Sequence, residues 1–174
     1  IVEKSATEGP RITDITGTQP QAKLGQLVDT TMTTQFLARV VKALPGKDPL
    51  HDRASAALDK CLAKLKSSQQ QNGSWGKGGW APVLQSSLGT TALELAQVAG
   101  KDIDMDGLRR ARAYQKGNFN VKTGKVDASS GAGVALYSFA GAQRASAGEA
   151  RAAQQLVEDA KLAGKLDPTA TVNE

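Results

Sequence analysis

Three carboxylates stand at alternate positions near the middle of the chain, at Asp102, Asp104 and Asp106. Clustered carboxylates can act as acids or bind a divalent cation through their oxygens. A calcium loop of the EF-hand type would need more ligands and a distal Glu, which this stretch lacks. The cluster follows Gly100, where a turn must enter a helix, and Asp is common at helix starts because it caps free N–H groups. The pattern favours this structural role, and the three residues remain candidate acids or cation ligands.

A second group of metal-type ligands consists of Asp59, Cys61 and the single histidine, His51. A zinc site needs at least three protein ligands in a suitable geometry. His51 lies about two helical turns before Asp59, and Cys61 falls within an apolar stripe of leucines. We therefore expect a buried, unreactive thiol, an exposed histidine, and neither a metal site nor a cofactor.

Other catalytic signatures are missing from the sequence. A Ser/His/Asp triad would have to use His51, and no nucleophile-elbow sequence is present. The glycines around Lys77 do not have the spacing of a phosphate-binding loop, and no predicted strand precedes them. The sequence therefore favours a non-catalytic protein.

Both tryptophans of the chain, Trp75 and Trp80, stand in one Gly-rich loop. Aromatic rings in such a loop could form a platform for a ligand ring, an isoprenoid chain or a partner side chain. For Trp75 the pattern favours packing over its own helical hairpin, and for Trp80 both roles are open. These two residues are the candidate ligand- or partner-binding residues.

The composition indicates one domain of closely packed helices. The 174 residues are enough for a real core, and hydrophobic residues make up 40% while aromatic residues make up only 4%. The apolar share is therefore mostly Ala, Leu and Val, and Ala favours close helix packing. Basic and acidic residues are mixed, with a net charge of +5, which favours a solvated surface over a nucleic-acid site. No apolar run approaches the ~20 residues of a membrane span.

The sequence leaves the compartment open. The single cysteine excludes an internal disulfide framework. A chain that begins at Ile1 rather than Met fits an exported protein after removal of a signal peptide, a processed fragment or a cloned domain. We expect a soluble protein and keep all three alternatives.

Six helices are predicted to position these residues. Residues 1–24 lack helical periodicity and predict an irregular N-terminal arm, and residues 167–174 predict a polar tail. Residues 25–166 between them are expected to form one helical domain. Apolar residues at steps of three and four predict helices over 26–44, 51–70, 83–99, 104–116, 128–143 and 147–163.

Three residues receive specific structural roles. Phe36 is expected on the buried face of the first helix, and Asp104 as the N-cap of the fourth. Ser146 is expected to cap the sixth helix, with Glu149 three residues later as in a capping box.

The chain also shows internal repetition. Thr91-Ala-Leu93 and Val134-Ala-Leu136 lie about 43 residues apart, and each follows a loop rich in Gly and polar residues. A period near this value is typical of stacked helical pairs, which repeat every ~40–47 residues. The repetition predicts about three antiparallel helical hairpins.

The stretch Gln69-x-x-x-Gly73-x-Trp75 resembles the Gln-Trp repeat of the squalene–hopene cyclase and protein prenyltransferase superfamily. The match covers residues 58–96 well and 108–142 loosely, and the resemblance implies an α/α toroid of paired helices. We expect Gln69 to bond carbonyls at the helix end and in the next turn, and Gly73 to adopt positive φ. Trp75 should cover the edge of the apolar layer while its ring N–H finds a backbone acceptor.

The chemistry that the resemblance implies is matched only in part. Cyclases of this class protonate an alkene with an Asp-x-Asp-Asp motif, whose neighbouring carboxylates keep one acid protonated. In this chain the third Asp, Asp106, stands one place too far along. Asp59-x-Cys61 resembles part of the prenyltransferase zinc site but lacks its distant His. The superfamily's complement-type thioester domains need a Gly-Cys-Gly-Glu-Gln setting, which Cys61 does not have.

A closed toroid of this superfamily uses about five to seven hairpins, as the resemblance implies, and this chain supplies about three. We therefore expect an all-α fold of about three stacked hairpins forming a partial α/α toroid, whose open edges need a partner. Our hypothesis is a non-catalytic structural or protein-interaction module, a subunit or fragment of a larger assembly that self-associates or binds a protein. The alternative is a half-domain of a cyclase- or prenyltransferase-like enzyme, or a carrier, that binds an apolar, isoprenoid-like molecule.

Overall fold

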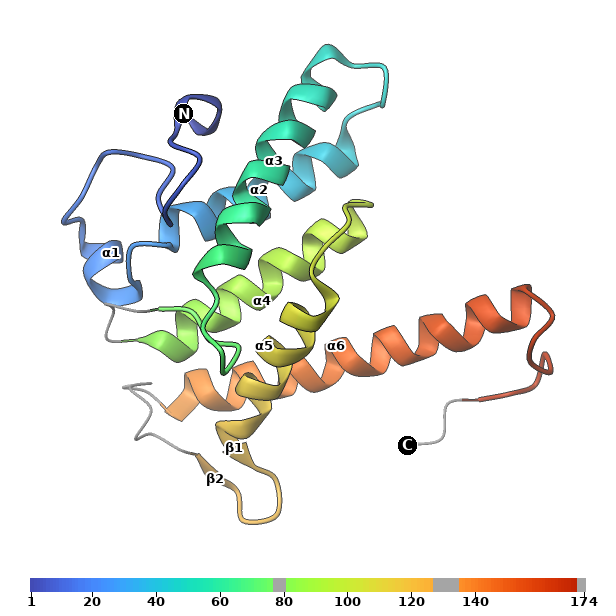
Figure 1. Ribbon diagram of the computed structural model, residues 1–174. Helices are drawn as coiled ribbons and strands as arrows, with labels where there is room; N and C mark the ends of the chain where they lie inside the picture. Colours follow the sequence, from blue (N-terminus) through green and yellow to red (C-terminus); the bar gives the residue numbers. More distant parts are fainter. Residues whose placement is uncertain (77–80, 127–134, 172–174) are drawn as a thin grey trace.

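The structure, a computed structural model, describes residues 1–76, 81–126 and 135–171 (Figure 1). The described chain is all-α apart from one very short antiparallel hairpin, so the predicted fold class is confirmed. The helices are the 3-10 turn η1 (Val2–Lys4), α1 (Gln19–Leu24), α2 (Val28–Ala43), α3 (Pro49–Ser68), α4 (Pro82–Val98), α5 (Met105–Gly117) and α6 (Ala135–Leu162), and the strands are β1 (Phe119–Asn120) and β2 (Lys125–Val126).

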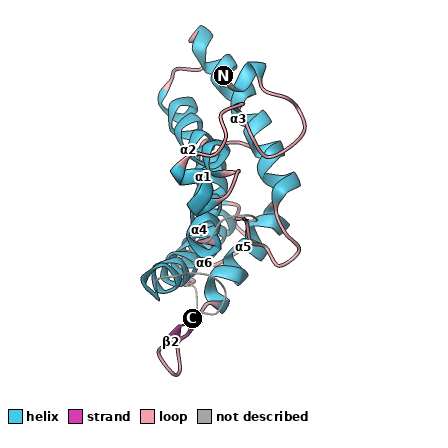
Figure 2. Cartoon of the chain, turned by 90° about the vertical axis from the view of Figure 1, so that its left-hand side faces the viewer, coloured by secondary structure: helices cyan, strands magenta, loops and turns pink. Residues whose placement is uncertain are grey.

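The long helices pack in two layers. Helices α2, α4 and α6 lie side by side in one layer, and α3 and α5 cover them in the second (Figures 1 and 2). Helices α2 and α3 form one hairpin, and α4 and α5 form a second. The third hairpin that the sequence predicts is not formed, because the single helix α6 spans most of the range of its two helices. None of the helices in the described ranges has the length and apolar character that crossing a membrane requires.

Helix α6 is one continuous helix where the sequence predicts two. Ser146, the expected N-cap, lies in its middle. No proline interrupts the helix, and a glycine inside a helix costs only about 1 kcal/mol relative to alanine. The two glycines near the expected break serve packing instead, because a Cβ on Gly141 would collide with the side chain of Gln115 and one on Gly148 would collide with that of Glu94. The part of the predicted fifth helix before residue 135 lies outside the described residues.

The buried face of α2 includes three threonines beside Val28, Gln35, Ala38 and Val41, and it does not include Phe36, whose side chain is 63% exposed. Thr31 donates to the carbonyl of Leu27 at 3.0 Å, and Thr34 donates to the carbonyl of Thr30 at 2.7 Å. These hydroxyls are satisfied inside their own helix, so their methyl groups can face the core without a lost hydrogen bond. Small side chains suit α2 because it packs against both α3 and α4, whereas a Phe ring would hold those helices apart.

Helix α1 lies inside residues 1–24, for which the sequence predicts an irregular arm. A capping box explains it: Thr18 accepts from the backbone N–H of Gln21, and the Gln21 side chain accepts from the backbone N–H of Thr18. The Gln21 amide also donates to Asp29 Oδ2 at 2.7 Å. Six residues are too few for a periodic apolar signal, so this helix depends on its cap and on contacts with α2.

The core lies between α2, α3, α4 and α5. The predicted stripe of Leu58, Leu62 and Leu65 on α3 is buried there. Trp75, from the turn after α3, is 1% exposed and belongs to the same cluster. The other members of the cluster are Leu27, Ala38, Val41, Ala92, Leu93, Ala96, Leu108 and Ala111.

Candidate functional site

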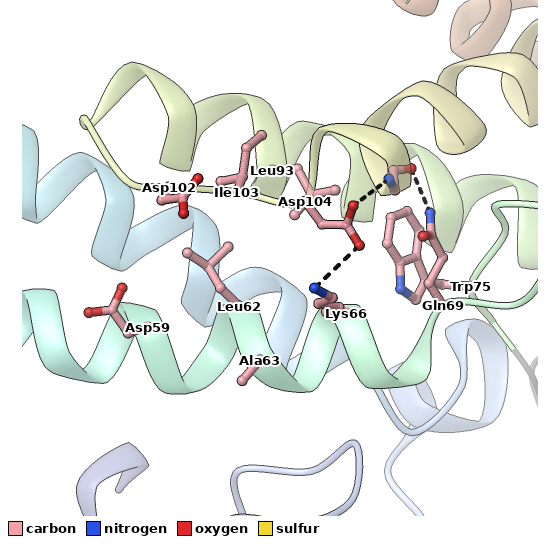
Figure 3. Close-up of a pocket in the computed structure, with 11 residues that line it drawn as sticks. Asp59, Leu62, Ala63, Lys66, Gln69, Trp75, Leu93, Asp102, Ile103 and Asp104 are labelled. Carbon is pink, nitrogen blue, oxygen red and sulfur yellow. Dashed lines mark hydrogen bonds and ion pairs between the residues drawn. The ribbon is translucent and has the colours of Figure 1, made fainter.

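A pocket of about 270 Å³ lies between α3 and the connection from α4 to α5 (Figure 3). Its centre is apolar, and charged side chains stand around it on both walls. Two of the predicted site residues, Asp102 and Asp104, are on the α5 side. The lining consists of Asp59, Leu62, Ala63, Lys66, Gln69, Trp75, Leu93, Asp102, Ile103, Asp104 and Gly107.

The Gln-Gly-Trp turn forms one end of this pocket and makes the contacts predicted for it. The side-chain amide of Gln69 donates to the carbonyls of Gly73 at 3.1 Å and Gly107 at 2.8 Å. Gly73 has φ of +86°. The ring N–H of Trp75 donates to the carbonyl of Leu65 at 2.9 Å. The turn therefore joins the end of α3 to the first turn of α5 and fixes the width of the pocket.

Trp75 packs over its own hairpin, as the sequence favours. A Cβ on Gly89 would lie 2.6 Å from Trp75 Cε3, so the indole lies directly on the backbone of α4. The ring therefore contributes only to the inner wall of the pocket and presents no open platform. Trp80, the other candidate binding residue, lies outside the described residues.

The three aspartates of the predicted acidic cluster do not converge. Asp104 is the N-cap of α5, as predicted, and accepts from the Gly107 N–H at 2.9 Å. Its carboxylate also lies 3.8 Å from Lys66 Nζ, as Figure 3 shows. Asp106 is exposed and pairs with Arg109 at 2.8 Å on the outer side of α5. Asp102 is also exposed and lines the pocket.

The electrostatics at Asp104 argue against a proton donor. The hydrogen bond from Gly107 holds the pKa of Asp104 below its ordinary value, and the nearby positive charge of Lys66 acts in the same direction. A general acid that protonates a substrate near neutral pH needs a raised pKa. Asp104 is therefore ionised at neutral pH and serves α5 as its cap.

The prediction for Asp104 concerns stability and its pH dependence. Replacing Asp104 with Ala should lower the free energy of unfolding by about 0.5–2 kcal/mol at pH 7. The folded pKa is lower than the ordinary value of 3.8, so this contribution is complete above that value and disappears as the pH falls through the folded pKa. Urea unfolding at pH 7 and at acidic pH measures the difference. An exposed control, Asp106→Ala, should cost less than about 1 kcal/mol.

The other candidate ligands have separate structural contacts. Asp59 pairs with Lys101 at 2.7 Å, which links α3 to the start of the connection before α5. His51 lies 3.3 Å from Asp52 near the start of α3. Cys61 is completely buried, and burial raises the pKa of its thiol to about 11. Within residues 1–76, 81–126 and 135–171, no group of three or more His, Cys, Asp or Glu side chains is placed to hold a metal ion.

Sequence reasoning missed a basic face on α3 that binds the N-terminal arm. The side chain of Lys64 is 1% exposed. Its Nζ donates to the carbonyls of Thr7, Glu8 and Gly9 at 3.4, 3.2 and 3.0 Å. One turn earlier, Lys60 donates to the carbonyl of Ser5. A lysine is usually solvated, so neither residue alone gives a signal in the sequence.

Apolar contacts complete the attachment of the arm. Val2 and Ile12 form a small buried cluster with Ala57 and Cys61 of α3. This cluster is separate from the main core. The arm therefore covers the only cysteine of the chain, and the reactivity of that thiol reports whether the arm is bound.

Replacement of Lys64 by Met should speed alkylation of Cys61 in the folded protein by about 10- to 100-fold. Hydrogen bonds from a charged donor contribute roughly 1.5–3 kcal/mol, and their loss favours the open state of the arm. The measurement is the rate of maleimide labelling under native conditions. Lys66→Met is the control, since Lys66 faces the pocket, and should leave the rate unchanged. Equal rates in both variants would mean that Lys64 does not hold the arm.

Comparison of the chain with protein-family models, with curated proteins and with solved structures finds no match. The resemblance to the Gln-Trp repeat therefore rests on residues 58–96 and on the contacts of the turn inside them.

Proposed function

We propose that this chain is a non-catalytic interaction module, an open arc of stacked helical hairpins of the α/α-toroid type that binds a protein partner. The two layers support the arc, with α2, α4 and α6 in one layer and α3 and α5 in the other. The contacts of Gln69, Gly73 and Trp75 support the repeat type.

The observation that carries the proposal is the C-terminal half of α6. Figure 1 shows this half extending beyond α4 and α5. The first half of α6 has buried residues up to Gly148, but none of residues 149–162 is buried. This half nevertheless keeps an apolar stripe, in which Leu156 is exposed and Ala153, Val157 and Ala160 are half-buried.

An apolar stripe on an extending helix is typical of a docking surface. The four residues recur at steps of three and four, so they share one face of the helix. Leu156 is 71% exposed. Covering apolar surface of this kind with a partner removes it from water and lowers the free energy of the complex.

A hydrophobic dye tests this surface directly. At low protein concentration, the chain should enhance the fluorescence of an anilinonaphthalene sulfonate dye, and Leu156→Glu should remove most of the enhancement. Leu50→Glu is the matched control, because Leu50 is also exposed but lies at the start of α3. A chain that remains monomeric in light scattering and binds no dye would contradict the proposal.

A second candidate function is a carrier for a small apolar ligand, which the apolar centre of the pocket favours. Leu62, Leu93 and Ile103 line this centre. The volume of about 270 Å³ is below the ~300–1,000 Å³ of typical ligand pockets, which makes this candidate the weaker one.

The double replacement by Asn of Asp102 and Asp104, the two aspartates of the predicted acidic cluster that line the pocket, separates the two functions. If the aspartates serve a ligand, this variant loses binding of a short isoprenoid alcohol. Asn caps helices about as well as Asp, so under the first proposal the variant should unfold at nearly the temperature of the original chain. Thermal unfolding and titration with the alcohol distinguish these outcomes.

A further inference from the structure

The N-terminal residues occupy a surface on α3 that recognises an irregular segment mainly through its backbone. Lys60 and Lys64 donate to carbonyls of Glu3, Ser5, Thr7, Glu8 and Gly9. Every residue carries a carbonyl, so these contacts bind the conformation of the segment and not its side chains. The same face of α3 would hold any segment of this shape equally well through these bonds.

Three further contacts make the surface specific for this chain's own sequence. Val2 and Ile12 bury their side chains against Ala57 and Cys61. The guanidinium of Arg53 pairs with Glu3 at 3.0 Å. A segment that satisfies both the apolar contacts and the ion pair needs this order of residues, and residues 1–12 provide it.

The connection from this segment to the body of the protein is short and exposed. Residues 14–17 are exposed, and Gly17 has φ of +74° with no atom near the position of a Cβ. Beyond Gly17 the chain is fixed again by the capping box of α1. Rotation within residues 14–17 would move residues 1–12 away from α3 without breaking a contact of the main cluster around Trp75. It would break the bonds of Gln21 to the Ile15 carbonyl and of Thr30 to the Pro10 carbonyl, and it would open the small cluster around Cys61.

We infer that two copies of this chain exchange their N-terminal arms, so that residues 1–12 of one copy bind the α3 of the other. The exchanged arm makes the same contacts as the arm bound to its own α3, which is the usual basis of domain swapping. Because a short tether gives the arm an effective concentration on the order of millimolar, exchange requires either high protein concentration or another contact that holds two copies together. The apolar stripe of α6 would supply such a contact if it bound a second copy of the chain. The exchanged arm itself binds α3, which is a different surface.

A cysteine at position 2 tests the exchange. Val2 and Cys61 belong to one buried cluster, so the variant Val2→Cys brings a second thiol into the cluster that contains Cys61 wherever the arm binds. Oxidation of the full chain should give an internal disulfide at low concentration and a growing fraction of covalent dimer as the concentration approaches millimolar. The dimer should be absent from the double variant with Cys61→Ser, which can form dimers only through residue 2.

Several outcomes would overturn the inference. An internal disulfide alone at every concentration would show that the arm stays on its own α3, and no disulfide at all would show that Val2 does not lie on Cys61. Dimers of equal amount in the double variant would be linked through residue 2 and not through α3. Dye binding to the α6 surface is measured separately, so exchange can fail while the proposed function holds.

A second measurement avoids new cysteines. The single variants Arg53→Glu and Glu3→Arg each place like charges together when the arm binds its own α3. In an equal mixture, exchange between the two variants restores both opposite-charge pairs. Sedimentation should therefore show more dimer in the mixture than in either variant alone, and equal amounts in all three samples would contradict exchange.

Discussion

Replacing Trp75 with Ala should lower the free energy of unfolding by about 3–5 kcal/mol, the largest effect expected of any single replacement in the core. Trp75 is 1% exposed and lies between the backbone of α4 at Gly89 and the end of α3. Its removal leaves a cavity and takes the hydrogen-bond donor from the carbonyl of Leu65. Stabilities of domains are only about 5–15 kcal/mol, so the midpoint of thermal unfolding should fall by roughly 6–20 °C.

Urea unfolding followed by far-UV circular dichroism measures this loss without using tryptophan fluorescence. The variant Trp75→Phe separates the two causes, because it keeps much of the ring packing but has no N–H for Leu65. We expect it to lose less stability than Trp75→Ala. If the alanine variant lost less than about 1 kcal/mol, the indole would not be the centre of the core.

Replacing Gly73 with Ala should cost about 2–5 kcal/mol. Its φ of +86° imposes strain of roughly 1–2 kcal/mol on a residue with a side chain. A Cβ would also lie only 2.8 Å from the backbone nitrogen of Ala111 and closer still to the carbonyl of Arg110. Since both contacts are with the backbone of α5, the helix would have to move, and overpacking of this kind typically costs about 1–3 kcal/mol.

Gly100 provides the matched control for this prediction. It has φ of +78°, similar to Gly73, but nothing lies within 4 Å of the position of its Cβ. Gly100→Ala should therefore lower the free energy of unfolding by the conformational strain alone, about 1–2 kcal/mol. The difference between the two variants in urea unfolding isolates the contact of the turn with α5. Equal losses would mean that the turn and α5 are not in contact.

Both predictions concern the turn that holds α5 against α3, and this turn also decides the chemistry of the pocket. Gln69 bonds the carbonyl of Gly107, and Asp104 bonds the N–H of the same residue. The carboxylate is thus committed to the start of α5 in its ionised form. The same contacts that stabilise the fold leave Asp104 unsuited to donate a proton.

Local patterns in the sequence were enough to predict the helices of the centre and the roles of the turn between them. Leu58, Leu62 and Leu65 repeat at helical spacing, and the structure buries all three. Asp104 caps α5, and Gln69, Gly73 and Trp75 make the predicted contacts. Apart from the bond of Gln69 to the carbonyl of Gly107, which is 38 residues away, these features depend on residues close in the chain, because caps, turns and amphipathic faces follow from local backbone geometry.

Tertiary contacts decided the features that the sequence left ambiguous or predicted wrongly. Gly141 and Gly148 could end a helix or allow another helix to approach, and only the side chains that α4 and α5 place beside them show that they do the second. Phe36 is exposed because the buried face of α2, which packs against α3 and α4, is formed by other residues, mostly small ones such as the threonines, Ala38 and Val41. The burial of Lys64 depends on carbonyls more than fifty residues earlier in the chain. A pattern of residue types identifies the apolar and polar faces of one helix. Which face is buried, and which segment buries it, depends on residues far away in the chain, and the local spacing carries no information about them.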